Sequence, residues 1–438
     1  MKLETFFDPI QYKALFQSQL ARNIFTNYLA VIWMGGLSIL LIPFYLKFLG
    51  SEQWGIVAIC MALQGFFNLL DAGLAQIMPR DVARVSHDPD ACLKTYVIYQ
   101  RTYLFLALSG FLIGQFSVPW LVDHWFSGGN SFSAQDSWAF HLVIVQFLFQ
   151  FSNNANIGYW NGKQLQAMAN FRQCAFGSLK HFGALSLVYF WQADAIAYLI
   201  PFTVVSAFEF FTNRHAISQS LKGSHAQPID WMDYKKLGSE GGMLFVGVLI
   251  GMLASQMDRI VLSKYVDVAS FGIYVIVANL GLAVMQLQHP LVRAFLPRMT
   301  QDLAGNNKSS FRRLAFGMTF LCIVPCLVLA LLSPWILKVW IGNPEVVSEG
   351  SLVLSLLFCA VACNAIYQLI YQRVLVSGDG RWVIKTNAVI LILILPLILS
   401  IVSIFGITAG GIYWLAMTFL QLIFGLLWLN MQSRATKD

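Results

Sequence analysis

Long apolar runs alternate with short polar and basic segments along the chain. Most of these runs are ~20 residues long, which is enough for an α-helix to cross about 30 Å of hydrocarbon. They lack the ~10-residue alternation that is typical of an outer-membrane β-barrel. The pattern therefore predicts an all-α integral membrane protein with about twelve transmembrane helices. We expect them at residues 24–48, 57–77, 96–118, 140–160, 171–191, 196–212, 241–262, 271–292, 314–332, 352–376, 383–405 and 411–430.

The composition supports a membrane protein. Of the 438 residues, 58% are hydrophobic and 11% are charged, and the mean hydropathy is +0.65. A soluble domain could not bury so much apolar surface. Most of the 28 Lys and Arg residues flank the spans on the side of the two termini; the exceptions are Lys47, Arg259, Lys264 and Lys338. By the positive-inside rule both termini face the cytoplasm, and the net charge of +7 needs no nucleic acid as a partner.

The second span and its flanks, residues 48–84, return in altered form at residues 265–302. Gly55 corresponds to Gly272 with a separation of 217 residues, and Pro79 corresponds to Pro297 after one slipped residue. A shift of about half the chain indicates two similar halves. Each half has an even number of spans, so both enter the membrane the same way. The repeat therefore predicts two six-helix lobes related by a pseudo-twofold axis along the membrane normal, a parallel repeat.

The spans divide the chain into five predicted segments. Residues 1–22 form a cytoplasmic N-terminal segment, either an amphipathic helix on the membrane surface or a loosely ordered tail. Residues 23–212 and 241–431 form the two lobes. A cytoplasmic linker at residues 213–240 joins the lobes, and residues 432–438 form a cytoplasmic tail.

The sequence contains no motif for catalysis or for a cofactor. It has no G-x-x-x-x-G-K-[ST] phosphate loop, no H-E-x-x-H metal motif and no nucleophile elbow. The seven cysteines form no C-x-x-C pair and lie mostly in apolar runs, which favours small packing residues over a disulfide or a metal site. We therefore expect a protein that is not an enzyme and that uses no cofactor and no metal.

Charged residues inside the spans are the candidates for function, because each is costly in hydrocarbon unless it meets a partner or water. The fifth span is the most polar. Lys180 and His181 lie ~12 Å above Arg172 along the helix axis, near the bilayer centre, where a cation could bind a diphosphate. The alternative is that Lys180 and Arg172 extend to the interface or pair with an acid such as Glu209. Arg293, close to the predicted cytoplasmic surface, could help collect an anionic headgroup.

Five residues are candidates for gating or ion coupling. Asp71 lies in the second span, and His289 occupies the corresponding place in the eighth, where it either titrates near neutral pH or is simply hydrogen-bonded. Glu209 closes the sixth span, where it either pairs with a cation or carries a proton. Asp258 and Arg259 close the seventh span, as an internal pair that gates the outer mouth or as a plain helix-end pair.

Several short stretches carry a resemblance to a known family. They are LGSEQWGI at residues 49–56, LLDAGL at 69–74 and PRDVAR at 79–84, with DRIVLSKY at 258–265, FGIY at 271–274 and FLPRM at 295–299 in the second half. On these motifs the chain resembles the bacterial polysaccharide flippases, the O-antigen (Wzx-type) translocases. They belong to the multidrug/oligosaccharidyl-lipid/polysaccharide (MOP) exporter superfamily.

The resemblance implies a fold and a function. Two six-helix lobes would enclose a central cavity and rock in alternating access, driven by an ion or proton gradient. The substrate would be an undecaprenyl-diphosphate-linked oligosaccharide, a repeat unit of O-antigen, capsule or exopolysaccharide. It would pass from the cytoplasmic to the periplasmic leaflet of the bacterial inner membrane, and polymerase and chain-length-control proteins of glycan assembly would be partners. Relatives that flip the peptidoglycan precursor have several cavity arginines in their early spans. The first span here has none past Arg22, so the resemblance does not imply that substrate.

Two other functions stay open. One is a multidrug and toxin exporter of the same superfamily, which would antiport cations and should prefer acidic residues for a cationic drug. The other is a membrane component of glycan assembly that transports nothing. The deepest charge, Lys180, favours an anionic substrate, and the half-chain repeat weighs against the component that transports nothing.

Overall fold

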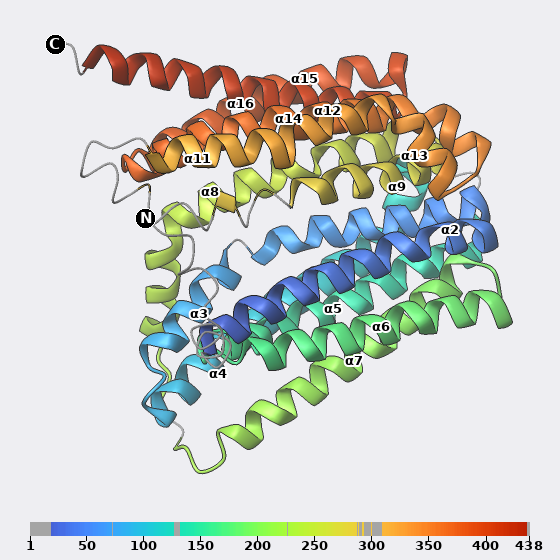
Figure 1. Ribbon diagram of the computed structural model, residues 1–438. Coiled ribbons are helices and arrows are strands. Elements are labelled where there is room, and N and C mark those ends of the chain that lie inside the picture. The colour runs from blue at the N-terminus through green and yellow to red at the C-terminus, as the bar shows by residue number, and fades with distance from the viewer. Residues whose placement is uncertain are drawn as a thin grey trace, which may run out of the picture. The chain divides into compact units, whose positions relative to one another are not determined.

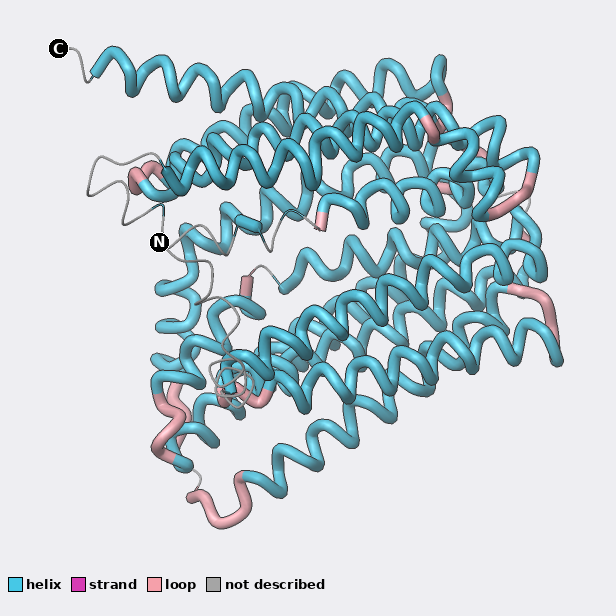
Figure 2. The backbone as a smooth tube through the Cα atoms, in the orientation of Figure 1, coloured by secondary structure: helices cyan, strands magenta, loops and turns pink. Residues whose placement is uncertain are grey.

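The computed structural model describes residues 19–71, 73–126, 132–225, 227–286, 288, 291–292, 299 and 309–435. Within these residues the chain is almost entirely helical and contains no β-strand (Figure 1 and Figure 2). Nine of the described helices are long and apolar enough to cross a membrane. The prediction of an all-α membrane protein is confirmed.

The first half begins with one long helix that bends at a glycine. Helix α2 (Gln19–Phe67) holds the first span and the first half of the second. Gly50, between the two spans, has a φ of 75°, a backbone conformation that residues other than glycine rarely adopt. A short 3₁₀ turn at Asn68–Asp71 follows. The chain then forms α3 (Leu74–Arg84), α4 (Pro89–Trp120), α5 (Ala134–Gly162), α6 (Gln166–Phe190) and α7 (Ala195–Ser220).

The second half starts with α8 (Trp231–Tyr265) and α9 (Val268–Met285). Asp267 caps α9, since its carboxylate accepts a hydrogen bond from the backbone N–H of Ser270 at 2.9 Å. A π-helical turn at Thr319–Ile323 joins α11 (Ser309–Met318) to α12 (Val324–Leu331). Helices α13 (Ser333–Trp340), α14 (Pro344–Val376), α15 (Gly380–Phe405) and α16 (Thr408–Ala435) follow.

These helices reproduce most of the predicted spans, with three differences in detail. Helices α5 and α6 have 29 and 25 residues, so they are long enough to cross a membrane, but neither contains an uninterrupted stretch as apolar as those of the nine helices. The predicted span at residues 57–77 is interrupted, because its helix ends at Phe67 and the next begins after Gly73, which has a φ of 94°. Helix α7 continues to Ser220 and α8 starts at Trp231, so the predicted linker is helical at both ends.

The described residues fall into two compact units. Unit 1 lies within Met1–Phe48, Phe67–Pro119 and Ala134–Phe245, and unit 2 within Leu49–Phe66, Trp120–Ser133 and Val246–Asp438. In unit 1, α5 packs against α3, α6 and α7. In unit 2, α14 packs against α9, α12, α13 and α16. The part of α2 after Gly50 therefore belongs to unit 2, although it lies in the first half of the sequence.

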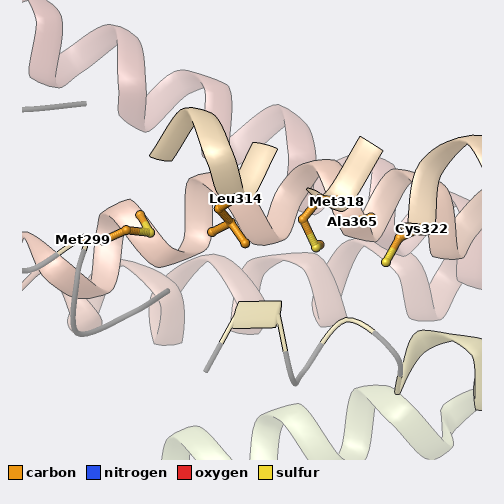
Figure 3. Close-up of a cluster of buried hydrophobic side chains, with 5 residues drawn as sticks. All are labelled: Met299, Leu314, Met318, Cys322 and Ala365. Atoms are coloured by element: carbon orange, nitrogen blue, oxygen red, sulfur yellow. The ribbon is translucent and has the colours of Figure 1, made fainter. Parts of the chain in front are cut away.

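Apolar clusters contribute to the packing of unit 2. The cluster drawn in Figure 3 consists of Met299, Leu314, Met318, Cys322 and Ala365. Cys326 lies in a neighbouring cluster with Val361 and Ala362. Each of these two cysteines therefore packs as a small apolar residue.

A close contact in unit 2 brings together the two glycines that the repeat relates. A Cβ on Gly272 would lie 2.9 Å from the Cα of Gly55, and a Cβ on Gly55 would overlap the backbone of Val268, at 2.6 Å from its carbonyl carbon. Only glycine leaves enough room for these two helices at this crossing. The part of α2 after Gly50 thus meets the start of α9 at repeat-related positions.

Candidate functional site

A buried ion pair lies at the centre of the polar residues of unit 1. Lys180 on α6 donates from Nζ to Oε2 of Glu209 on α7 at 2.7 Å, and the two side chains are 12% and 8% exposed. The other carboxylate oxygen of Glu209 accepts a hydrogen bond from Asn153 on α5 at 3.0 Å. The structure therefore shows the alternative that the sequence left open for Lys180, pairing with Glu209.

Asparagine side chains extend this pair across three helices. The Oδ1 atom of Asn153 accepts hydrogen bonds from Asn156 at 2.9 Å and from Asn213 at 3.0 Å. The Oδ1 atom of Asn213 in turn accepts from Nε of Arg172 at 2.7 Å. Arg172 and Lys180, two residues that the sequence singled out, are thus connected through Asn213, Asn153 and Glu209.

A second branch of the network reaches α4. Tyr96 donates from its hydroxyl to Oδ1 of Asn156 at 2.7 Å, and Gln100 donates to the hydroxyl oxygen of Tyr96 at 3.0 Å. Asn156 is fully buried. Both branches point their donors toward Glu209, so the carboxylate is the final acceptor of the whole chain of hydrogen bonds. Aligned hydrogen bonds of this kind polarise one another and stabilise a negative charge at the end.

The guanidinium group of Arg172 lies against aromatic rings. Its Cζ atom is 5.4 Å from the ring centroid of Trp160 and 5.8 Å from that of Phe176, both within range of a cation–π interaction. The side chain is half-buried. Within the described residues, Arg172 belongs to no ion pair.

His181 lies in the same unit but outside this network. Its Nε2 atom is 3.4 Å from Oγ of Ser38, and its ring meets the ring of Phe202 edge-on at 5.1 Å. The backbone carbonyl of His181 accepts a hydrogen bond from Tyr45 at 2.7 Å. The residue thus packs α6 against α2 and α7, and it does not turn toward Glu209 as Lys180 does.

Asp71 lies at a break between helices and not inside one. One carboxylate oxygen accepts a hydrogen bond from the hydroxyl of Tyr103 at 2.6 Å, and the other accepts from the backbone N–H of Ala75 at 3.2 Å. The second contact places a carboxylate at the positive N-terminal end of α3, where it stabilises the helix. The prediction that the helix of the second span continues through Asp71 is wrong, because the 3₁₀ turn and Gly73 end it there.

The adjacent charges Asp258 and Arg259, in unit 2, have different partners. The carboxylate of Asp258 is fully buried, and its Oδ2 atom accepts hydrogen bonds from the hydroxyl of Tyr274 and, at 3.0 Å, from the indole N–H of Trp414. Its Oδ1 atom has no hydrogen-bond partner among the described residues. Arg259 donates from Nη2 to Asn279 at 2.7 Å.

The remaining two candidates, His289 and Arg293, lie outside the described residues. The amides that carry the network of unit 1, namely Asn153, Asn156 and Asn213, were not identified from the sequence. A signal for the first two was present, since a spacing of three residues places both on one face of α5.

A cavity of about 320 Å³ lies elsewhere in unit 1, where the end of α3, the start of α4 and the start of α8 meet. Lys94 and Asp233 form an ion pair at 3.0 Å on its wall, with side chains 26% and 27% exposed. Asp81 accepts a hydrogen bond from Tyr99 at 2.6 Å and lies 3.5 Å from Arg84. The charges that line this cavity are therefore paired with one another.

Known proteins match the chain over most of its length. The sequence profile of a family described as polysaccharide biosynthesis protein matches residues 20–302. A protein of Shigella flexneri named "Putative O-antigen transporter" is 22% identical over 377 residues, which are 85% of this chain and 88% of that protein.

Solved structures match the fold. An inward-facing multidrug resistance transporter of the MATE family, from the MOP superfamily, has a TM-score of 0.71 at 12% identity, over 92% of this chain and 95% of that one. The lipid II flippase MurJ, in an inward closed conformation, has a TM-score of 0.69 at 11% identity, over 93% and 87% of the two chains. The chain therefore has the fold of the MOP superfamily transporters, as the resemblance of its motifs implied.

Proposed function

Because the chain belongs to the polysaccharide biosynthesis protein family, we propose that it is a flippase for a lipid-linked oligosaccharide. The substrate is an undecaprenyl-diphosphate-linked repeat unit, which moves from the cytoplasmic to the periplasmic leaflet of the bacterial inner membrane by alternating access. Both termini lie on the cytoplasmic side, as the basic residues indicate. Polymerase and chain-length-control proteins of glycan assembly are the expected partners.

One observation in unit 1 carries the choice of substrate. The hydrogen-bonded network contains two cations, Lys180 and Arg172, and one anion, Glu209. It therefore keeps a surplus positive charge among the packed helices α5, α6 and α7, which suits the diphosphate of a lipid carrier. A cationic drug would be repelled there, so the network favours the flippase over the multidrug exporter.

Energy for transport comes from an ion or proton gradient in this proposal. Asp258 is the best candidate for the coupling group, since its carboxylate is fully buried and leaves one oxygen unpartnered among the described residues. Glu209 is less suited, because both of its oxygens accept hydrogen bonds. Asp71 is also less suited, because both of its oxygens accept hydrogen bonds.

Deletion of the gene in its own bacterium tests the function. We expect loss of the surface glycan on gels and accumulation of lipid-linked repeat units on the cytoplasmic side, both restored by a plasmid copy. Susceptibility to cationic drugs should not change. A deletion strain with normal glycan and raised drug susceptibility would instead identify an exporter, and normal glycan with no other defect would reject transport of a glycan precursor.

A further inference from the structure

The charge balance of the network singles out one of its two cations. Lys180 is neutralised by Glu209 at 2.7 Å, and the second oxygen of that carboxylate is taken by Asn153. Arg172 has no carboxylate partner among the described ion pairs. The surplus positive charge of the network therefore resides on Arg172 and not on Lys180.

The surroundings of Arg172 fix its guanidinium group and leave one edge open. Its Nε atom donates to Asn213, and its plane lies near the rings of Trp160 and Phe176. These contacts use one of the five N–H donors of the group. Neither Nη atom has a described acceptor and the residue is only half-buried, so the edge that can donate two parallel hydrogen bonds to a carboxylate or a phosphate is available.

The depth of the two cations along α6 fits this division of roles. Arg172 lies six residues after Gln166, the first residue of α6, which is ~9 Å along the helix axis, and Lys180 lies ~12 Å further. The polar headgroup layers border a hydrocarbon core that is about 30 Å thick. An uncompensated cation is tolerated near the headgroups but is costly deep in hydrocarbon. The deep cation is accordingly paired, and the shallow one has no acidic partner within the described part of the chain.

We propose that the open Nη edge of Arg172 binds the phosphate of a membrane lipid headgroup, with Asn213 and Trp160 positioning the guanidinium for it. The inference rests on the proposed function, in which that phosphate belongs to the diphosphate of the lipid carrier. An anionic phospholipid of the bilayer offers the same chemistry, so the two sources must be compared directly. Glu209 has a complementary role, since it keeps Lys180 from competing for the phosphate.

Lipid binding to the purified full-length protein tests this site. Native mass spectrometry would measure the affinity for undecaprenyl diphosphate, for phosphatidylglycerol and for the zwitterionic phosphatidylcholine. Charge-assisted, bidentate hydrogen bonds are stronger than hydrogen bonds between neutral groups. We therefore expect Arg172→Gln to weaken binding of the anionic lipid that occupies the site by about ten-fold or more. The affinity of Arg172→Lys should fall between those of this variant and the wild type, because lysine keeps the charge but cannot donate two parallel hydrogen bonds.

Arg373 on α14 provides a matched control. It is also half-buried and also lies over an aromatic ring, with its Cζ atom 5.2 Å from the centroid of Phe311. Arg373→Gln should bind each lipid as the wild type does. Melting temperatures of all variants would show that they are folded, and Arg172→Lys keeps the test informative if Arg172→Gln is unstable.

The outcomes separate the site from the function. A loss confined to undecaprenyl diphosphate assigns the site to the carrier, and a loss confined to phosphatidylglycerol assigns it to a bilayer lipid. Wild-type affinity of Arg172→Gln for both anionic lipids, or an equal loss in Arg373→Gln, would overturn the site. Either of these two results would leave the proposed function standing if the deletion strain still loses its surface glycan.

Discussion

Neutralising Lys180 alone should destabilise the protein far more than neutralising Lys180 and Glu209 together. At 2.7 Å, and with side chains only 12% and 8% exposed, the two charges attract each other by about 6 kcal/mol at an effective dielectric constant of about 20. Much of this offsets the cost of removing the charges from water. Breaking a buried pair by removing one partner typically costs about 3–5 kcal/mol, whereas replacing both partners with neutral groups is often close to neutral.

A double-mutant cycle measures this coupling. The variants are Lys180→Met, Glu209→Gln and their combination, and equilibrium unfolding of the purified protein in mixed detergent micelles gives the free energies. Glu209→Gln keeps an acceptor for Asn153, so it removes the charge with little change in shape. We expect a coupling energy of at least about 2 kcal/mol, because residues in direct contact within one polar network couple strongly.

The pair of Lys94 and Asp233 is the control for this cycle. It joins the same kinds of charge at 3.0 Å in the same unit, but its side chains are 26% and 27% exposed. Contact with water weakens an ion pair, to about 0.2–1 kcal/mol at fully exposed sites, so Lys94→Met with Asp233→Asn should show weaker coupling. Additive effects at Lys180 and Glu209, or coupling no larger than in the control, would refute the argument that Glu209 neutralises Lys180.

Two further predictions concern unit 2. Gly55→Ala should lower the stability of the purified protein by about 1–3 kcal/mol, because its Cβ would overlap the backbone of Val268. Gly36→Ala, with no atom within 4 Å of its Cβ, should be neutral or stabilising by up to about 1 kcal/mol; equal melting temperatures for the two variants would contradict the close contact. Asp258→Asn keeps an acceptor for Tyr274 but cannot ionise, so it should fold normally and fail to restore surface glycan in the deletion strain. Full restoration would remove Asp258 from ion coupling.

The helices were predictable because they depend on the length of apolar runs, which is a local property. The break within the predicted second span was missed for the same reason. The apolar run continues past Asp71, so the local signal of an acidic residue followed by Gly73 was interpreted as part of a longer helix. A carboxylate that accepts from the backbone of Ala75 and from Tyr103 is evident only once the chain has bent.

Which side chains of two neighbouring helices contact each other depends on how each helix is rotated about its axis. The sequence does not determine that rotation. An error of one residue in a helix turns a side chain by about 100°. Lys180 could therefore be identified as a deep charge, and Glu209 could be named as one possible partner, but the choice between Glu209 and a cavity required the packing of α6 against α7. The amides Asn153 and Asn213 were missed because uncharged polar residues are common between membrane helices and give a weak signal.

The repeat and the polar network lead to different conclusions about symmetry. Residues that correspond in a repeat can touch only where the repeated elements cross, and Gly55 and Gly272 do so in unit 2. A requirement for small side chains therefore applies to both copies. The network has no such counterpart, because the position 217 residues after Lys180 is Leu397, in an almost purely apolar helix. The glycine contact thus joins positions that the sequence repeat relates, whereas the network of Lys180, Glu209 and Arg172 belongs to unit 1, as expected if this unit recognises the anionic headgroup.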